Sequence, residues 1–409
     1  MLPIVVWPGL VRPFSSPKLL LVVLIAAVLA WFGSPGWSSL APALRWSALG
    51  WIATFVIAAL ASDLPALGPL VLGVAAPLLA LGALRASVAP LALVRAMVVG
   101  ATACAGVAVL QWAGHDPFVW AGWHAPVDGA SVRMRVYGTL GNPNFVGALM
   151  AMSLPLAAAV HRETRRAVGR RVIEVSLGLQ ALALVATGSR GAVLGLCAAA
   201  AIYAFLRWSR RVRLAVGALI VFAGIAVISS PARPLDTTAA GRLHLWRVAL
   251  LHAAESPFTG LGPGAVTLHF PAWQRDAART GVRDPRFAGP TDHVHNDYLE
   301  ALIERGMPGL LALVLPLGFV LVRAVRCRRP ASPLVAGSCA AVIAGAACAV
   351  VDFPLARPTE LTWWWVALAV ALQATANPAS GVTFAPAAPT PYKSRQDRDS
   401  GGDRCVQEQ

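Results

Sequence analysis

The stretch DHVHNDYLE, residues 292–300, closes the longest polar interval in a chain that otherwise consists mostly of apolar runs. A fresh apolar run follows at 306–323, so the stretch lies where the chain returns to the membrane. It holds two histidines, His293 and His295. A side chain that can take up a proton near neutral pH is rarely placed at such a boundary by packing alone. The stretch is therefore the first candidate for a functional site.

Local signals place His295 beside the start of a short helix. Asn296 or Asp297 can cap this helix, and Glu300 can bond back as in a capping box. Gly306 is a natural stop for it. The ring of His295 is therefore expected at a helix N-terminus, where it can face an anionic substrate.

The composition indicates an all-α polytopic membrane protein. Of the 409 residues, 57% are hydrophobic and only 13% are charged, which is about half the charged share of a soluble domain. Apolar runs of bilayer length recur, so we expect a transmembrane helix bundle of 11–12 spans. The runs lie near 18–33, 44–62, 65–84, 91–112, 144–160, 172–188, 191–206, 213–230, 306–323, 333–351 and 361–375.

The charges between these runs predict the orientation. Segments dense in arginine are expected in the cytoplasm: 161–171, 207–213 and 323–329. Other polar segments then fall on the outer, periplasmic side: 112–143, 231–305 and 352–360. Counting back places Met1 outside, whereas Arg12 and Lys18 favour a cytoplasmic start. One further span near the N-terminus, making twelve, would reconcile the two.

The sequence predicts one membrane domain, residues 1–376, whose periplasmic loop 231–305 carries short helices. Residues 377–409, rich in Ala, Pro, Ser and Gly, are expected to form a disordered cytoplasmic tail. The net charge of +15 comes largely from the short basic loops. Basic and aromatic residues do not interleave as they do on nucleic-acid surfaces, so no nucleic-acid partner is expected.

Arginines on the outer side are candidates for substrate binding. Arg190 stands in a tight turn where the charge rule disfavours it, so it either binds an anion in a cavity or reaches lipid headgroups. Arg242 lies on an expected amphipathic helix, and its planar fork suits a pyrophosphate. Arg133 and Arg135 precede the turn GNPN at 141–144, although interfacial arginines also snorkel.

The spacing of His293 and His295 raises the question of whether the two side chains bind a metal ion. In an extended segment both rings point the same way, and Asp292 or His269 could complete a site. The spacing alone does not specify a metal, so we expect no metal and no cofactor. His293 and Asn296 are instead expected to contact the substrate.

These features fit a lipid-linked diphosphate held at the membrane surface by Arg190 and Arg242. Neutralising the diphosphate makes it a better leaving group, and His295 as general base takes the proton of the attacking hydroxyl. A single displacement inverts the anomeric centre without a metal, and no carboxylate pair marks a glycosidase. Asp352 or Glu360, in the link between the last two runs, is expected to pair with an arginine in a structural role.

The pattern His295-Asn296, nine residues, then Gly306 and Gly309 resembles the His-[Asn/Ser/Gln]-x9-Gly-x-x-[Gly/Thr/Trp] motif of the O-antigen ligase family. The resemblance covers roughly residues 90–375. Its weaker signatures are RVYGTLGNPN at 135–144, TGSRGA at 187–192, GRLHLW at 241–246 and DFPL at 352–355.

The resemblance implies a bacterial inner-membrane glycosyltransferase with His295 as the essential histidine and with Arg190 and Arg242 binding undecaprenyl diphosphate. Such an O-antigen ligase moves a glycan from this carrier onto lipid A-core at the periplasmic face. An O-antigen polymerase or a protein O-oligosaccharyltransferase of the same family would keep the donor and change the acceptor. A membrane transporter is the rival from another class, disfavoured because the ionisable residues lie almost entirely at loop level.

Overall fold

A computed structural model describes most of the chain. The described residues are 2–7, 12–32, 37–63, 66–86, 89–119, 136–228, 235–327 and 330–373. The predicted tail, 377–409, lies outside them, and so do Arg133 and Arg135.

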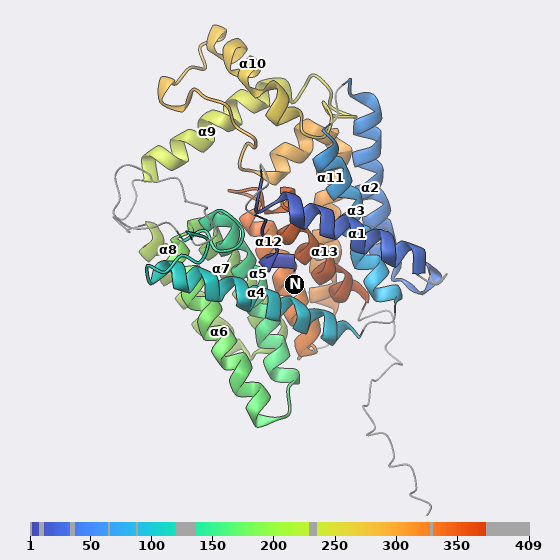
Figure 1. Cartoon of the computed structure of the whole chain (residues 1–409), viewed down its shortest axis with the longest axis vertical. Coiled ribbons are helices and arrows are strands. Elements are labelled where there is room, and N and C mark those ends of the chain that lie inside the picture. Colours follow the sequence, from blue (N-terminus) through green and yellow to red (C-terminus); the bar gives the residue numbers. More distant parts are fainter. Residues whose placement is uncertain are drawn as a thin grey trace, which may run out of the picture. The chain divides into compact units, whose positions relative to one another are not determined.

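The described residues are largely helical and contain no strand, as the composition predicts. Apolar helices coincide with the predicted runs: α1 (Ser16–Phe32), α2 (Pro42–Ala61), α3 (Leu67–Arg85), α4 (Pro90–Trp112), α5 (Pro143–Glu163), α6 (Ala167–Thr187), α7 (Arg190–Arg207), α8 (Arg210–Ile228), α11 (Asp297–Arg326), α12 (Pro333–Cys348) and α13 (Pro358–Gln373). Six helices within the described residues are long and apolar enough to cross a membrane: α2, α3, α4, α5, α7 and α11. The chain is therefore an all-α, multi-pass membrane protein (Figure 1).

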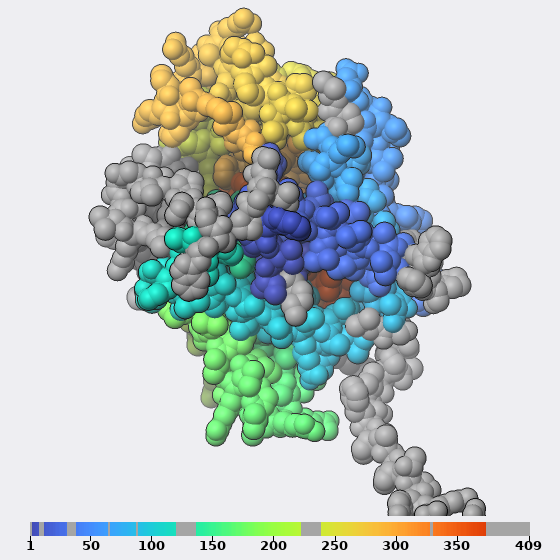
Figure 2. Space-filling view, in the orientation of Figure 1, coloured from blue at the N-terminus to red at the C-terminus, as the bar shows by residue number. Residues whose placement is uncertain are grey.

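The long polar interval carries α9 (Leu235–His252), α10 (Ala265–Arg279) and the short 3-10 helix η4 (Pro285–Phe287). These helices pack on the first turns of α11 through a small apolar cluster that includes Val248, Phe270, Trp273 and Ile303. Figure 2 shows α9 and α10, in yellow to orange, at the opposite end from the green turn that joins α5 to α6. The bundle therefore has two distinct ends.

Helix α11 is interrupted at Gly306, where the sequence predicts a stop. Gly306 has φ 66° and ψ −168°, which is outside the helical region and costly for residues with a Cβ. A Cβ at Gly306 would lie 2.6 Å from the backbone carbon of Phe258. Beyond the break the N–H of Met307 donates to the carbonyl of Pro257 at 2.7 Å. The predicted short helix and the following apolar run thus form one broken helix.

The interior of the bundle is built from small residues on α5, α7 and α12. A Cβ at Gly195 would lie 2.4 Å from Sγ of Cys348, so α7 and α12 approach as closely as glycine permits. On α13, Trp364 and Trp365 are fully buried, and Nε1 of Trp364 donates to the carbonyl of Val342 at 3.1 Å. This packing holds the link between α12 and α13 in place.

The two N-terminal cations contact segments that belong to the predicted outer side. Nζ of Lys18 donates to the carbonyls of Phe14 at 2.6 Å and Thr139 at 2.7 Å, and the side chain is 1% exposed. Arg12 lies 3.8 Å from Asp292. Neither cation therefore supplies a reason for a cytoplasmic start or for a twelfth span.

Candidate functional site

The stretch 292–300 forms the cap of α11. Oδ1 of Asn296 accepts from the N–H groups of Tyr298 and Leu299, both at 3.0 Å, so Asn296 is the capping residue. Glu300 reaches back past Asn296, and its Oε2 accepts from the N–H of Val294 at 3.3 Å. The expected capping box therefore forms, but Glu300 accepts from the N–H of Val294 and not from that of the capping residue. Contact of Asn296 with substrate stays a prediction.

His295 is held in a backbone conformation that few residues adopt. Its φ is +55°, and no other described residue except glycine has a positive φ. Nδ1 lies 3.4 Å from Oδ1 of Asp352, at ion-pair distance but without the alignment of a hydrogen bond. The His295 side chain is 33% exposed, whereas that of Asp352 is only 8% exposed. One ring nitrogen thus faces a buried carboxylate on a partly exposed ring.

His293 has a carboxylate of its own. Its Nδ1 lies 2.7 Å from Oε1 of Glu300, and its ring stacks on Phe353 with centroids 4.0 Å apart. The two histidines therefore form separate pairs, His293 with Glu300 and His295 with Asp352. Among the described residues, no three His, Cys, Asp or Glu side chains come together as a metal site.

Arg242 approaches the same buried carboxylate from α9. Burial lowers the pKa of Arg242, and the charge of Asp352 opposes that shift. One turn further along α9, Nε1 of Trp246 donates to the carbonyl of Val294 at 2.9 Å. This bond fixes α9 against the residue that precedes His295.

Arg190 begins α7, whose first turn packs beside the segment that leads to Asp352. Ser189 caps α7 by accepting from the N–H of Ala192 at 3.3 Å. A Cβ at Gly191 would lie 3.1 Å from Cγ2 of Val351, one residue before Asp352. Arg190 therefore belongs to a helix start that packs next to this segment.

The link between α12 and α13 is where these elements meet. The N–H of Asp297 donates to the carbonyl of Ala349 at 2.9 Å, and Oδ2 of Asp297 accepts from the N–H of Leu355 at 2.9 Å. The start of α11 is thereby tied to both sides of Asp352. His295, Arg242 and the first turn of α7, which are far apart in the sequence, thus all lie near one short link.

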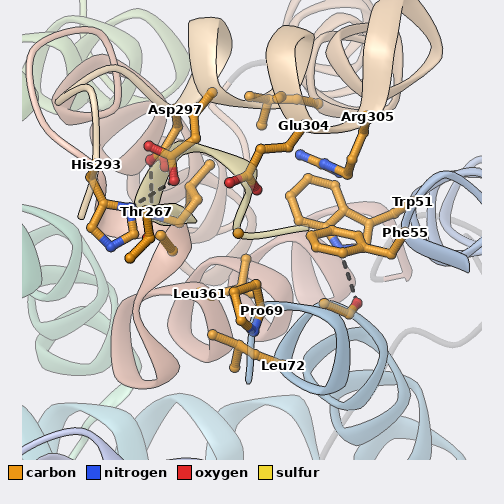
Figure 3. Close-up of a pocket in the computed structure, with 17 residues that line it drawn as sticks. Trp51, Phe55, Pro69, Leu72, Thr267, His293, Asp297, Glu304, Arg305 and Leu361 are labelled. Atoms are coloured by element: carbon orange, nitrogen blue, oxygen red, sulfur yellow. Dashed lines mark hydrogen bonds and ion pairs between the residues drawn. The ribbon is translucent and has the colours of Figure 1, made fainter. Parts of the chain in front are cut away.

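Two adjoining cavities open beside His293. The deeper one, about 70 Å³, lies between α2, α3 and α11, and Figure 3 shows Asp297 and Glu304 pointing into it between His293 and the Trp51–Phe55 pair. The outer one, about 370 Å³, extends to Arg12 and Arg357. His293 lines both cavities, whereas His295 lines neither of these two.

Sequence reasoning missed the acidic partners of the site. Asp352 or Glu360 was expected to pair with an arginine; the structure gives Asp352 an ionic contact with His295, while the charge of Arg242 acts on the same carboxylate. Glu304 was not singled out, although it is buried and lines the deeper cavity beside Arg305. The DFPL signature pointed to Asp352 without revealing which side chain it meets.

A comparison with known families matches residues 175–314 to the O-antigen ligase model. The matched segment runs from α6 into α11 and contains Arg190, Arg242, His293, His295 and Asn296. No curated protein matches the chain. The match indicates a membrane glycosyltransferase of the O-antigen ligase or polymerase type. Residues 175–314 are therefore similar to the O-antigen ligase family.

Proposed function

We propose that the protein is an O-antigen ligase of the bacterial inner membrane, with its active site facing the periplasm. It moves a glycan from undecaprenyl diphosphate to a hydroxyl group of lipid A-core. The observation that carries the proposal is the pairing of His295 with buried Asp352, with Arg242 beside the same carboxylate.

His295 acts as the general base. Asp352 faces Nδ1, so it orients the ring and stabilises the imidazolium that forms when Nε2 takes the proton of the acceptor hydroxyl. A base of this kind contributes about 10²- to 10⁴-fold to the rate. The partly exposed ring has room for an acceptor, while the carboxylate stays shielded from water.

Arg190 and Arg242 act on the leaving group. As the acceptor oxygen bonds to the anomeric carbon, the bond from that carbon to the diphosphate oxygen breaks, and its electron pair leaves with the diphosphate. Guanidinium groups aimed at this oxygen stabilise the developing charge. The single displacement inverts the anomeric centre, and no step needs a metal or a covalent glycosyl-enzyme.

The test is complementation of a deletion strain, with surface lipopolysaccharide separated on a gel. Wild type is expected to restore the long-chain ladder, whereas His295→Ala leaves bare lipid A-core while lipid-linked polymer accumulates. His244→Ala is the matched control, since His244 lies on α9 against Phe287. A full ladder with His295→Ala would refute the base assignment, and core carrying one repeat unit would identify a polymerase instead.

A further inference from the structure

A third cavity lies at the other end of the bundle from His295. It occupies about 300 Å³ between α5, α6 and α7, and α5 packs against both of the other helices (Figure 1). Its walls are apolar, with Leu177 on α6 and Leu196 on α7, and the hollow exists because the facing residues are small: Ala158, Ala199 and Ala200. We call it the α5–α7 crevice.

The mouth of the α5–α7 crevice is basic and aromatic. Arg162 is exposed at the end of α5, and Trp208 directly follows α7 and meets Tyr203 edge-on with centroids 5.5 Å apart. His161, also at the mouth, lies 2.8 Å from Glu174, so this nearby carboxylate already has a partner. A cation and an indole at the end of an apolar hollow match the headgroup level of a bilayer.

The surrounding charge favours an anion at this mouth. Residues 161–171 hold five arginines and one glutamate, and residues 207–213 hold four arginines and no acid. Basic pockets between transmembrane helices bind acidic lipid headgroups, and each cation near an anionic surface contributes about 1 kcal/mol. An apolar hollow with such a mouth accepts one acyl chain together with its phosphate.

We propose that the α5–α7 crevice binds an anionic phospholipid, with an acyl chain against Ala200 and the headgroup phosphate on Arg162. The site is separate from the one that contains His295, because α7 begins beside that site at Arg190 and ends at the crevice with Arg207. The bound lipid would fill the space between α6 and α7 and stabilise the packing of both helices on α5. The proposal does not depend on the glycosyltransferase activity.

The experiment is thermal unfolding of the full-length protein in a mild detergent, with added phosphatidylglycerol, phosphatidylcholine or inorganic phosphate. Native mass spectrometry counts the lipids that remain bound. Phosphatidylglycerol is expected to raise the unfolding midpoint more than phosphatidylcholine, and inorganic phosphate is expected to give no shift. Equal shifts with both lipids, or the same shift with inorganic phosphate, would overturn the proposal.

Two variants and two controls locate the effect. Ala200→Phe fills the crevice and is expected to lose both the shift and the retained lipid, while Val175→Phe, at a 70% exposed position on α6, keeps them. Arg162→Gln is expected to abolish the preference for phosphatidylglycerol, and Arg170→Gln, an exposed arginine outside the crevice, leaves it unchanged. Because Arg162 is exposed, Arg162→Gln is expected to fold, so it tests the site even where Ala200→Phe misfolds. An unchanged preference in Arg162→Gln would contradict the site.

Discussion

The ring of Phe353 lies flat against that of His293, with centroids 4.0 Å apart and planes inclined by 17°. The rings of Phe353 and His295 meet edge to face, with centroids 4.9 Å apart. The guanidinium carbon of Arg357 lies 4.8 Å from the centroid of the Phe353 ring. Phe353 has no group that can move a proton. It therefore serves as a rigid support that sets the positions of both histidines.

Replacing this support is predicted to slow glycan transfer. Phe353→Leu keeps an apolar side chain but removes the stacking surface, which is worth about 0.5–1.5 kcal/mol for an aromatic pair, so we expect up to about a tenfold loss of rate. The measurement is transfer from lipid-linked glycan in membrane vesicles. Phe145→Leu is the control, because Phe145 also packs against Phe353, with ring centroids 5.4 Å apart. Equal losses in the two variants would show that general packing is responsible.

Removing the charge that faces His295 is predicted to slow glycan transfer more than Phe353→Leu does. Asp352→Asn preserves size, but Nδ1 of His295 loses the carboxylate 3.4 Å away, and Arg242 loses its nearby anion. We expect transfer to fall by about 10²-fold or more, within the range for general-base catalysis, at an unchanged amount of protein in the membrane. The matched control is Asp284→Asn, a half-buried aspartate that pairs with Arg286 at 2.7 Å. Transfer near the wild-type rate in Asp352→Asn would remove Asp352 from the mechanism.

The break in α11 is predicted to require glycine. Gly306→Ala places a Cβ at φ 66° and 2.6 Å from the backbone of Phe258, so either the loop or the helix must shift. We expect destabilisation of about 1–3 kcal/mol, seen as a lower thermal unfolding midpoint in detergent. Gly318→Ala, later in the same helix, meets no atom within 4 Å and is expected to leave the midpoint unchanged. Matching midpoints for the two variants would mean that the break tolerates a side chain.

The sequence predicts the helices well because a bilayer-length apolar run is a local property. The candidate residues His295, Arg190 and Arg242 were also found locally, from a cap, a tight turn and an amphipathic helix. Their partners were not, because the distance between His295 and Asp352 is set by how α11 and α12 pack and not by any spacing in the chain. Lys18 is a second example of a contact that the sequence does not predict. The charge rule counts this residue as a cation, but it does not include the two carbonyls that accept from its Nζ.

Arg305 gives the last prediction, because it holds α2 against α11 next to the deeper cavity. Its guanidinium carbon lies 4.6 Å from the ring centroid of Trp51 and 4.2 Å from that of Phe55. Glu304, Asp297 and Glu300 are the charges that act on it. The residue thus combines two cation–π contacts with a set of buried carboxylates.

Two substitutions separate these roles. Arg305→Lys keeps the charge but loses the planar fork, so we expect a loss of about 1–2 kcal/mol. Arg305→Met also removes the cation near the buried carboxyl groups, so we expect a larger loss of stability than for Arg305→Lys. Thermal unfolding in detergent should rank wild type above Arg305→Lys and Arg305→Met last, while Arg326→Lys, in the exposed last turn of α11, stays at the wild-type midpoint. If Arg305→Met is as stable as Arg305→Lys, the buried carboxylates do not need this cation, and the aromatic contacts alone account for its place in the bundle.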